Sequence, residues 1–194
     1  MFMLTSFNPG SGKSFLAMNI AMSFAIKKKR ILVIDGDLRH GSTSSYVDSP
    51  KTGLSDYLGN RVSDWKEIIV KDEKYDNLHI IPIGTVPPNP TELLEDGKLA
   101  TLIEVLRSEY DYIFIDCPPI DIVADAQIIE KLADRTVFVV RSGLLDRSML
   151  PELENIYQEK RFKNLSVILN GTESAGGRYG YRYCLLYTSD AADD

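Results

Sequence analysis

A glycine-rich loop near the amino terminus carries the clearest chemistry in this sequence. Residues 7–14 read FNPGSGKS. Gly10 and Gly12 can turn backbone N–H groups inward around phosphate oxygens, at the positive end of the helix expected to follow. The Lys13 ammonium can reach β- and γ-phosphates, and the Ser14 hydroxyl can ligate Mg²⁺. The loop therefore predicts a nucleotide-binding site, and the alternative is a glycine-rich turn without a ligand.

The loop departs from the usual phosphate-binding pattern at one position. That pattern has a glycine separated from the Gly–Lys pair by four residues, and Phe7 holds this place here. The match is therefore a variant. It is supported by its context, because an apolar run precedes the loop and a helical pattern follows it.

Two carboxylates follow the next apolar run of the chain. Asp35 ends the run that begins at residue 31, and Asp37 comes two positions later. If the strand continues that far, its period of two puts both side chains on the same side. The carboxyl edge of a parallel sheet is where α/β folds bind ligands. These acids could hold hydrated Mg²⁺ and accept a proton from an attacking hydroxyl, or they could cap the next segment.

A third carboxylate, Asp116, ends another apolar run and is followed by Cys117, Pro118 and Pro119. An acid at this place is the expected second metal-side carboxylate of a phosphate-loop protein. The two prolines would stiffen a loop that senses the γ-phosphate. Cys117 could act as a nucleophile, but no histidine is near it in sequence, which favours a small packing residue.

Apolar runs alternate with helical patterns along most of the chain. The expected strands are residues 2–6, 31–35, 78–83, 112–116, 136–141 and 166–170. The expected helices are residues 13–28, 54–70 in two short pieces, 91–108, 123–133 and 148–160. Continuous runs of Ile, Val, Leu and Phe suit parallel strands that are covered on both faces. The alternation predicts an α/β fold with a three-layer, doubly wound, mostly parallel sheet.

Composition narrows the class of protein further. The 194 residues include 22 Lys plus Arg and 28 Asp plus Glu, and the net charge of −6 argues against a nucleic-acid partner. Two cysteines and two distant histidines supply no metal-ligand spacing. The longest apolar stretch, residues 15–26, is shorter than the roughly 20 residues that span a bilayer. These features indicate a cytoplasmic chain.

The pattern divides the chain into two parts. We expect one nucleotide-binding domain over residues 1–173, with its first strand truncated at the amino terminus, and a flexible Gly/Arg/Tyr tail over residues 174–194. The alternation of the tail stops at Tyr183, so residues 184–194 are expected not to be native.

Together the phosphate loop, the Asp-x-Asp-x-Arg run of residues 35–39 and Asp116 resemble the bacterial tyrosine kinases of capsule and exopolysaccharide synthesis. The stretch PPNPTELL at residues 87–94 resembles the Pro-rich helix start of that family. The resemblance covers residues 2–183 and implies a P-loop NTPase of the deviant Walker type. Related septum-positioning and plasmid-partitioning ATPases usually carry a lysine where this chain has Asn8, which favours the kinase branch.

The resemblance implies ATP and Mg²⁺ as cofactors and assigns roles to particular residues. The implied nucleotide-binding residues are Pro9, Gly10, Ser11, Gly12, Lys13, Ser14, Phe15 and Asn170, of which Asn170 would contact adenine. The implied metal-side residues are Ser14, Asp37 and Asp116. The implied catalytic residues are Lys13, Asp35, Asp37 and Asp116, with Asp35 as the base unless it exchanges roles with Asp37. The implied phosphoacceptors are Tyr179, Tyr181 and Tyr183.

The resemblance also implies partners and a location. Members transfer phosphate to the tail of a neighbouring copy in a ring-like homo-oligomer, and they serve a membrane-bound regulator of polysaccharide chain length that is fused upstream or separate. The expected place is the inner face of the plasma membrane. The helix that supports ring assembly in the family is missing from this sequence. Two alternatives stay open: an ATPase switch that hydrolyses ATP, and a non-catalytic, nucleotide-dependent adaptor.

Overall fold

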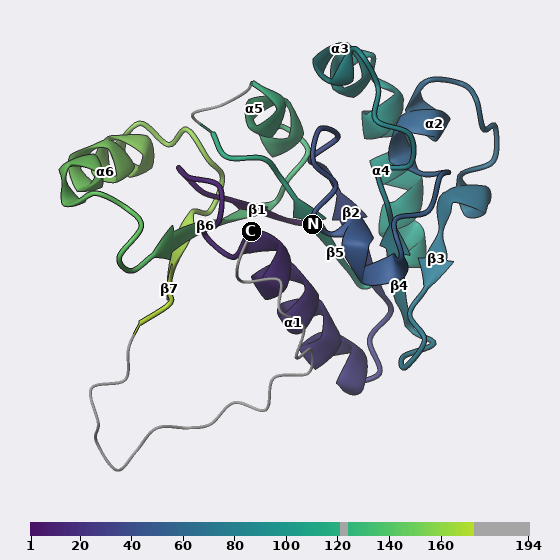
Figure 1. Cartoon of the computed structure of the whole chain (residues 1–194), viewed down its shortest axis with the longest axis horizontal. Helices are drawn as coiled ribbons and strands as arrows, with labels where there is room; N and C mark the ends of the chain where they lie inside the picture. Colours follow the sequence, from purple (N-terminus) through teal and green to yellow (C-terminus); the bar gives the residue numbers. More distant parts are fainter. Residues whose placement is uncertain (121–123, 173–194) are drawn as a thin grey trace.

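A twisted, mostly parallel sheet forms the centre of the molecule (Figure 1). The computed structural model describes residues 1–120 and 124–172. Its seven strands are β1 (Phe2–Thr5), β2 (Ile31–Asp35), β3 (Val70–Lys71), β4 (Leu78–Ile81), β5 (Tyr112–Asp116), β6 (Arg135–Arg141) and β7 (Ser166–Asn170). They lie in the order β3-β4-β2-β5-β1-β6-β7, and only β3 runs antiparallel to its neighbour. The predicted α/β class is confirmed.

Helices cover both faces of this sheet, so the fold has three layers. The α-helices are α1 (Lys13–Ile26), α2 (Leu54–Leu58), α3 (Pro90–Glu95), α4 (Lys98–Glu109), α5 (Asp125–Glu130) and α6 (Leu150–Gln158). Short 3₁₀ turns are η1 (Ser44–Val47), η2 (Trp65–Ile68) and η3 (Arg147–Met149). Figure 1 shows α1 on one face of the sheet and α2 to α6 on the opposite face.

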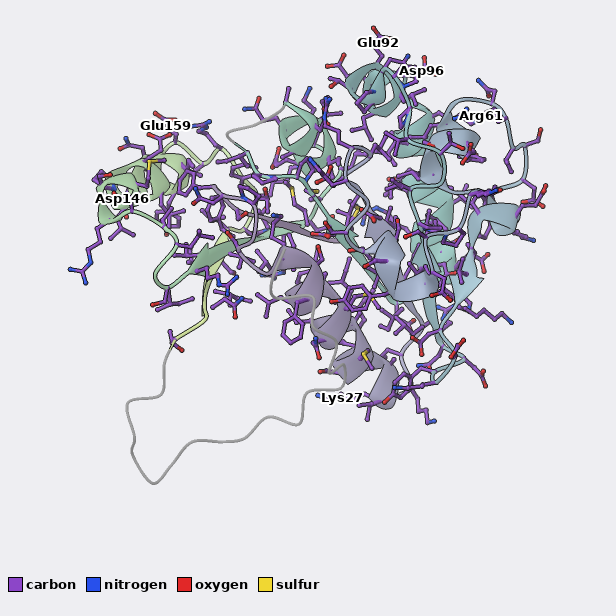
Figure 2. All side chains as sticks on the ribbon, viewed as in Figure 1. Lys27, Arg61, Glu92, Asp96, Asp146 and Glu159 are labelled. Atoms are coloured by element: carbon purple, nitrogen blue, oxygen red, sulfur yellow. The ribbon has the colours of Figure 1, made fainter. Side chains whose placement is uncertain are left out.

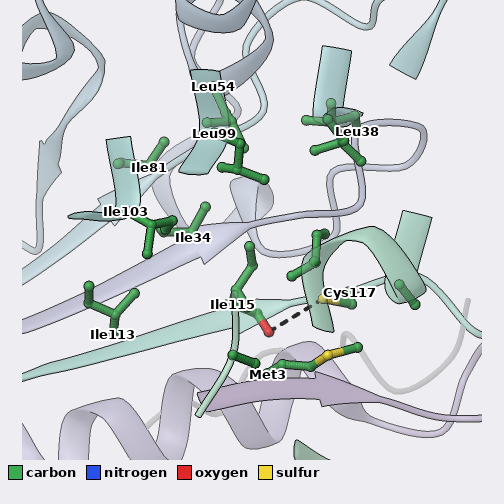
Figure 3. Packing of buried hydrophobic residues seen from close by; sticks show 14 of the residues in the cluster. Met3, Ile34, Leu38, Leu54, Ile81, Leu99, Ile103, Ile113, Ile115 and Cys117 are labelled. Atoms are coloured by element: carbon green, nitrogen blue, oxygen red, sulfur yellow. Dashed lines mark hydrogen bonds between the residues drawn. The ribbon is translucent and has the colours of Figure 1, made fainter. Parts of the chain in front are cut away.

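The two faces bury different kinds of side chain. On the α1 face, Ala17, Ala21 and Ala25 recur every four residues and let the helix approach the strands, while Met18 and Met22 fill the gaps. On the other face, aliphatic side chains of alternate strand positions pack against α2, α4 and α5 (Figure 3). Packing on both faces holds the sheet in place, and the sheet in turn positions the loops that follow its strands.

Two predicted elements differ from the observed ones. The helix predicted over residues 91–108 is divided into α3 and α4, because Gly97 adopts a left-handed φ of 81° between them. The helical pattern predicted over residues 54–70 contains α2 and η2 but ends in β3. That strand pairs antiparallel with β4 and is only two residues long, which is too short to leave a periodic signal. The other expected elements are confirmed with shifts at their ends.

Charged side chains lie around the outside of the domain (Figure 2). The labelled examples are Lys27, Arg61, Glu92, Asp96, Asp146 and Glu159, at helix ends and in loops. In the described part of the chain, no helix combines the length and the apolar character that crossing a membrane requires. The predicted tail and its tyrosines lie outside the described residues.

Candidate active site

The glycine-rich loop joins β1, in the middle of the sheet, to the start of α1. Gly10 and Gly12 both have left-handed backbone conformations, with φ of 70° and 86°. Gly12 is the N-cap of α1, so the first N–H groups of that helix point into the loop. The local geometry is therefore that of an anion cradle, with the helix dipole favouring phosphate.

Phe7 explains the departure from the usual glycine pattern. Its ring is buried and packs edge-on against Phe138 of β6, with ring centroids 4.8 Å apart. Its backbone does not take the positive φ that would require glycine. The first position of the loop is thus used for packing rather than for turning.

Lys13 lies at the first helical position, with only 9% of its surface exposed. Its Nζ donates to Ser6 Oγ over 3.2 Å, and Ser6 Oγ donates in turn to the carbonyl of Asn8 over 2.7 Å. Burial lowers the pKa of Lys13, and this effect is opposed by the negative charges of Asp116 and Asp37. The ammonium is held beneath the loop, beside the acids.

Asp116 receives two hydroxyl hydrogen bonds at one of its oxygens. Ser14 Oγ donates to Asp116 Oδ2 over 2.5 Å, and Thr43 Oγ1 donates to the same oxygen over 2.8 Å. The carboxylate is 2% exposed, and burial raises its pKa while the Ser14 hydrogen bond and Lys13 oppose that shift. The structure therefore brings together the predicted metal-side residues Ser14 and Asp116.

Asp35 is fully buried beside Asp116. Its Oδ2 accepts hydrogen bonds from Ser44 N over 2.7 Å and from Ser44 Oγ over 2.6 Å. Ser44 Oγ also accepts from the backbone N–H of Ile83 over 2.8 Å, which connects the site to the loop after β4. Burial and the neighbouring charge of Asp116 raise the pKa of Asp35 to about 8.

Asp37 lies in the loop after β2, because the strand ends at Asp35. Its carboxylate accepts from the backbone N–H groups of Arg39 and His40 and lies 3.2 Å from His40 Nδ1. Asp37 thus does cap its own loop, as the alternative interpretation held. Its negative charge also acts on Lys13, where it raises the pKa of the ammonium against the effect of burial.

One residue from β6 and one from β7 donate hydrogen bonds to the glycine-rich loop. Arg141, at the end of β6, donates from Nη1 to Gly10 O over 2.7 Å. Asn170, at the end of β7, donates from Nδ2 to Ser11 O over 3.0 Å. A Cβ on Gly12 would lie 2.3 Å from Asn170 Nδ2, and the φ of 86° would itself be strained for any other residue. The predicted contact of Asn170 with adenine stays a prediction.

Cys117 is fully buried, and burial raises the pKa of its thiol well above the usual value. Its Sγ lies 3.8 Å from the carbonyl of Ile115 within the packed cluster of Figure 3. A thiol in this state is a poor nucleophile. The environment favours the interpretation of Cys117 as a packing residue.

The side chains present fit a nucleotide-bound Mg²⁺. Asp35 Oδ1 and Asp116 Oδ1 are buried, and neither has a hydrogen-bond partner among the described residues. No three His, Cys, Asp or Glu side chains in that part of the chain gather as a metal cage. A phosphate-loop Mg²⁺ needs no such cage, since a hydroxyl, one or two carboxylates, phosphate oxygens and water complete its shell.

Sequence reasoning missed the hydroxyls and the arginine that hold these acids and the loop. Thr43 and Ser44 contact Asp116 and Asp35, and Arg141 contacts Gly10. The partners are separated by 73, 9 and 131 positions. The polar run Ser42–Ser45 was a signal that some hydroxyls were available, but no signal gave their partners.

Comparisons with known proteins show what this chain is similar to. The family model of the AAA domain matches residues 3–145. The tyrosine-protein kinase CpsD of Streptococcus pneumoniae is 35% identical over 179 residues, which cover 91% of this chain and 78% of the relative. The kinase domain of the Escherichia coli tyrosine kinase ETK has a TM-score of 0.81 and 32% identity, covering 94% of this chain and 71% of that chain.

A more distant neighbour shares the fold alone. The septum site-determining protein MinD of Pyrococcus horikoshii, solved in complex with Mg-ADP, has a TM-score of 0.69 and 21% identity. The match covers 87% of this chain and 68% of that one. The predicted P-loop architecture is thereby confirmed, and the roles predicted for single residues stay predictions.

Proposed function

Because the chain belongs to the bacterial tyrosine-protein kinases of capsule and exopolysaccharide synthesis, we propose that it transfers the γ-phosphoryl group of ATP to tyrosine hydroxyls. One observation carries the proposal at the level of the site. Ser14, at the start of α1, donates a hydrogen bond to Asp116, whose other oxygen has no hydrogen-bond partner among the described residues. This arrangement is suited to a metal bound between carboxylate and phosphates.

The residues of the chain would divide the work as follows. Lys13 and the backbone N–H groups at the start of α1 bind the phosphate oxygens and hold them in place. When bound, Mg²⁺ neutralises charge on the β- and γ-oxygens. Ser14, Asp37 and Asp116 orient it. In its ionised form Asp35 accepts the proton of the tyrosine hydroxyl, and its raised pKa, about 8, makes it a stronger base than an ordinary carboxylate.

The acceptors in this proposal are Tyr179, Tyr181 and Tyr183 of a neighbouring copy, within a ring-like homo-oligomer. A membrane-bound regulator of polysaccharide chain length is the proposed partner, and the inner face of the plasma membrane is the proposed location. The support for these points is the family membership and the short spacing of the three tyrosines beside Arg178 and Arg182.

Mass spectrometry after incubation with Mg-ATP tests the transfer. We expect phosphate on the three tyrosines, and none after Lys13→Met. A mixture tests transfer in trans: one copy carries Lys13→Met with intact tyrosines, and the other carries the tyrosines as phenylalanine with an intact site. Phosphate on the Lys13→Met copy supports transfer between chains.

The same samples separate the alternatives. ATP turnover with unmodified tyrosines would indicate an ATPase switch, with water as the acceptor. Nucleotide binding without turnover or modification would indicate an adaptor. Either outcome would contradict the kinase proposal.

A further inference from the structure

Arg39 makes contacts that the proposed phosphoryl transfer has not used. It is the last residue of the Asp-x-Asp-x-Arg run, two positions after Asp37. Its Nε lies 3.3 Å from Asp125 Oδ2, and its Nη2 lies 3.1 Å from Thr91 Oγ1. Thr91 Oγ1 donates to the other oxygen of Asp125 over 2.6 Å. Three side chains from three segments thus form a closed triangle.

The triangle is anchored in the interior. The side chain of Asp125 is only 1% exposed, whereas that of Arg39 is 35% exposed. Burying a carboxylate is unfavourable unless it is paired and hydrogen-bonded. Both oxygens of Asp125 have a partner, Arg39 for one and Thr91 for the other. The arrangement of the three segments is therefore held tightly, because a displacement of one would leave the Asp125 charge without its partners.

Two of the three segments joined follow the metal-side acids Asp37 and Asp116. Arg39 stands in the loop after β2, next to Asp37, whose Oδ1 accepts the Arg39 backbone N–H over 3.2 Å. Asp125 begins α5, the first helix after Asp116 and the proline loop. Thr91 lies in the first turn of α3. The triangle thereby fixes the loop that carries Asp37 relative to the element that follows Asp116.

We propose that Arg39 is a positioning residue, which sets the Asp37 loop against α5 through Asp125 and Thr91 so that Asp37 and Asp116 meet one Mg²⁺–nucleotide. The inference rests on the proposed nucleotide site, and it assigns Arg39 no contact with ATP. Outer partners that orient metal-side groups typically change metal affinity or activity about 10- to 100-fold when they are altered.

The test is the gain in nucleotide affinity that Mg²⁺ produces. A fluorescent ADP analogue is titrated into the full chain with and without Mg²⁺, and tyrosine phosphorylation is followed separately. Arg39→Lys keeps a charge near Asp125 but lacks the planar fork that reaches both partners. We expect metal-free ADP binding within about twofold of the wild type and a loss of the Mg²⁺-dependent gain of about tenfold. Arg30→Lys, in the exposed pair with Asp111, is the matched control and should behave as wild type.

A second pair of variants separates positioning from a general loss of structure. Thr91→Val keeps the Arg39–Asp125 ion pair but removes the hydroxyl, and Thr91→Ser restores it. We expect a reduced Mg²⁺-dependent gain for valine and a wild-type gain for serine. The inference is overturned if Arg39→Lys and Thr91→Val keep the full Mg²⁺-dependent gain. It is also overturned if they weaken ADP binding without Mg²⁺ as much as ADP binding with Mg²⁺. It is also overturned if Mg²⁺ leaves the affinity of the wild type unchanged.

The kinase proposal fails by a different result. A wild-type chain that binds ADP more tightly with Mg²⁺ but modifies no tyrosine contradicts tyrosine-kinase activity. The comparison between Arg39→Lys and Arg30→Lys still decides the positioning role in that case.

Discussion

Asp35 and Asp116 are register partners on the adjacent strands β2 and β5, and each has a buried Oδ1 that accepts no hydrogen bond from the described residues. Two acids in this position repel each other, and the charge of Asp116 raises the pKa of Asp35. A bound cation or Lys13 offsets that repulsion. The pair therefore favours a cation at this edge of the sheet.

The two acids should fail in different ways when they are made neutral. Asp116→Asn is expected to lose at least about tenfold of the Mg²⁺-dependent gain in ADP affinity, because it removes a metal-side oxygen. Asp35→Asn is expected to keep that gain and to lose about 10²- to 10⁴-fold in the rate of tyrosine phosphorylation, as for removal of a general base. Binding titrations and single-turnover rates measure both. If Asp35→Asn phosphorylates at the wild-type rate and Asp37→Asn does not, the two aspartates have exchanged roles.

Asn170 is expected to hold the glycine-rich loop and to contact the adenine of ATP. Loss of its hydrogen bond to Ser11 O is expected to weaken ATP binding about two- to tenfold in Asn170→Ala. Arg141→Ala removes a comparable contact to Gly10 O and is the matched variant. We expect Arg141→Ala to weaken ATP and GTP equally, and Asn170→Ala to weaken ATP more than GTP. Equal losses in Asn170→Ala would mean that its role is confined to the loop.

Stability should fall in mild acid because of His79. Its Nδ1 lies 2.7 Å from the Tyr110 hydroxyl, and burial, with a smaller contribution from Lys71 across the strand pair, lowers its pKa below the usual 6.5. Between the folded and the unfolded pKa, His79 is protonated in the unfolded chain and neutral in the folded chain. The contribution of neutral His79 to the free energy of unfolding is fully present above pH 6.5. It is lost as the pH falls toward the lower pKa of the folded chain.

Replacing the histidine tests this prediction. In His79→Gln, the drop in melting temperature between pH 7 and pH 5 should be smaller than in the wild type. The difference between the two curves removes the contribution of the carboxylates common to both. Parallel curves would contradict the assignment to His79.

Glycine at position 84 should be far less replaceable than glycine at position 143. Both have a positive φ, of 75° and 78°. A Cβ on Gly84 would lie 2.1 Å from Asp56 Oδ2 and 2.3 Å from Gly53 N, whereas one on Gly143 would meet nothing within 4 Å. Gly84→Ala should therefore lower the free energy of unfolding by about 3 kcal/mol or more, and Gly143→Ala by about 1 kcal/mol. Urea titration measures both values, and similar losses would contradict the prediction.

Six of the seven strands were predictable, because each contains a short apolar run of strand length. The division between α3 and α4 was also accessible, since Asp96 and Gly97 are a common break, but the helical period across them was stronger. β3 was not accessible, because its two residues form a strand only through the pairing with β4.

In the site, the residues proposed to bind nucleotide and metal were accessible from the sequence, and the residues that hold them in place were not. Lys13 and Ser14 belong to a contiguous motif, and Asp35 and Asp116 each end a strand. The residues that hold these side chains in place do so through contacts between distant parts of the sequence. Thr43 and Asp116, for example, lie 73 positions apart. Hydroxyl residues of that kind are common on any surface, so sequence alone does not single them out.

The contact between Asn170 and the glycine-rich loop also sets a limit on distance. Asn170 Nδ2 is 3.0 Å from Ser11 O, so the polypeptide leaves the sheet at the phosphate end of the site. Tyr179 follows nine positions later, and nine residues span at most about 30 Å. In the proposed transfer between copies, the site that accepts Tyr179 must therefore lie within about 30 Å of Asn170.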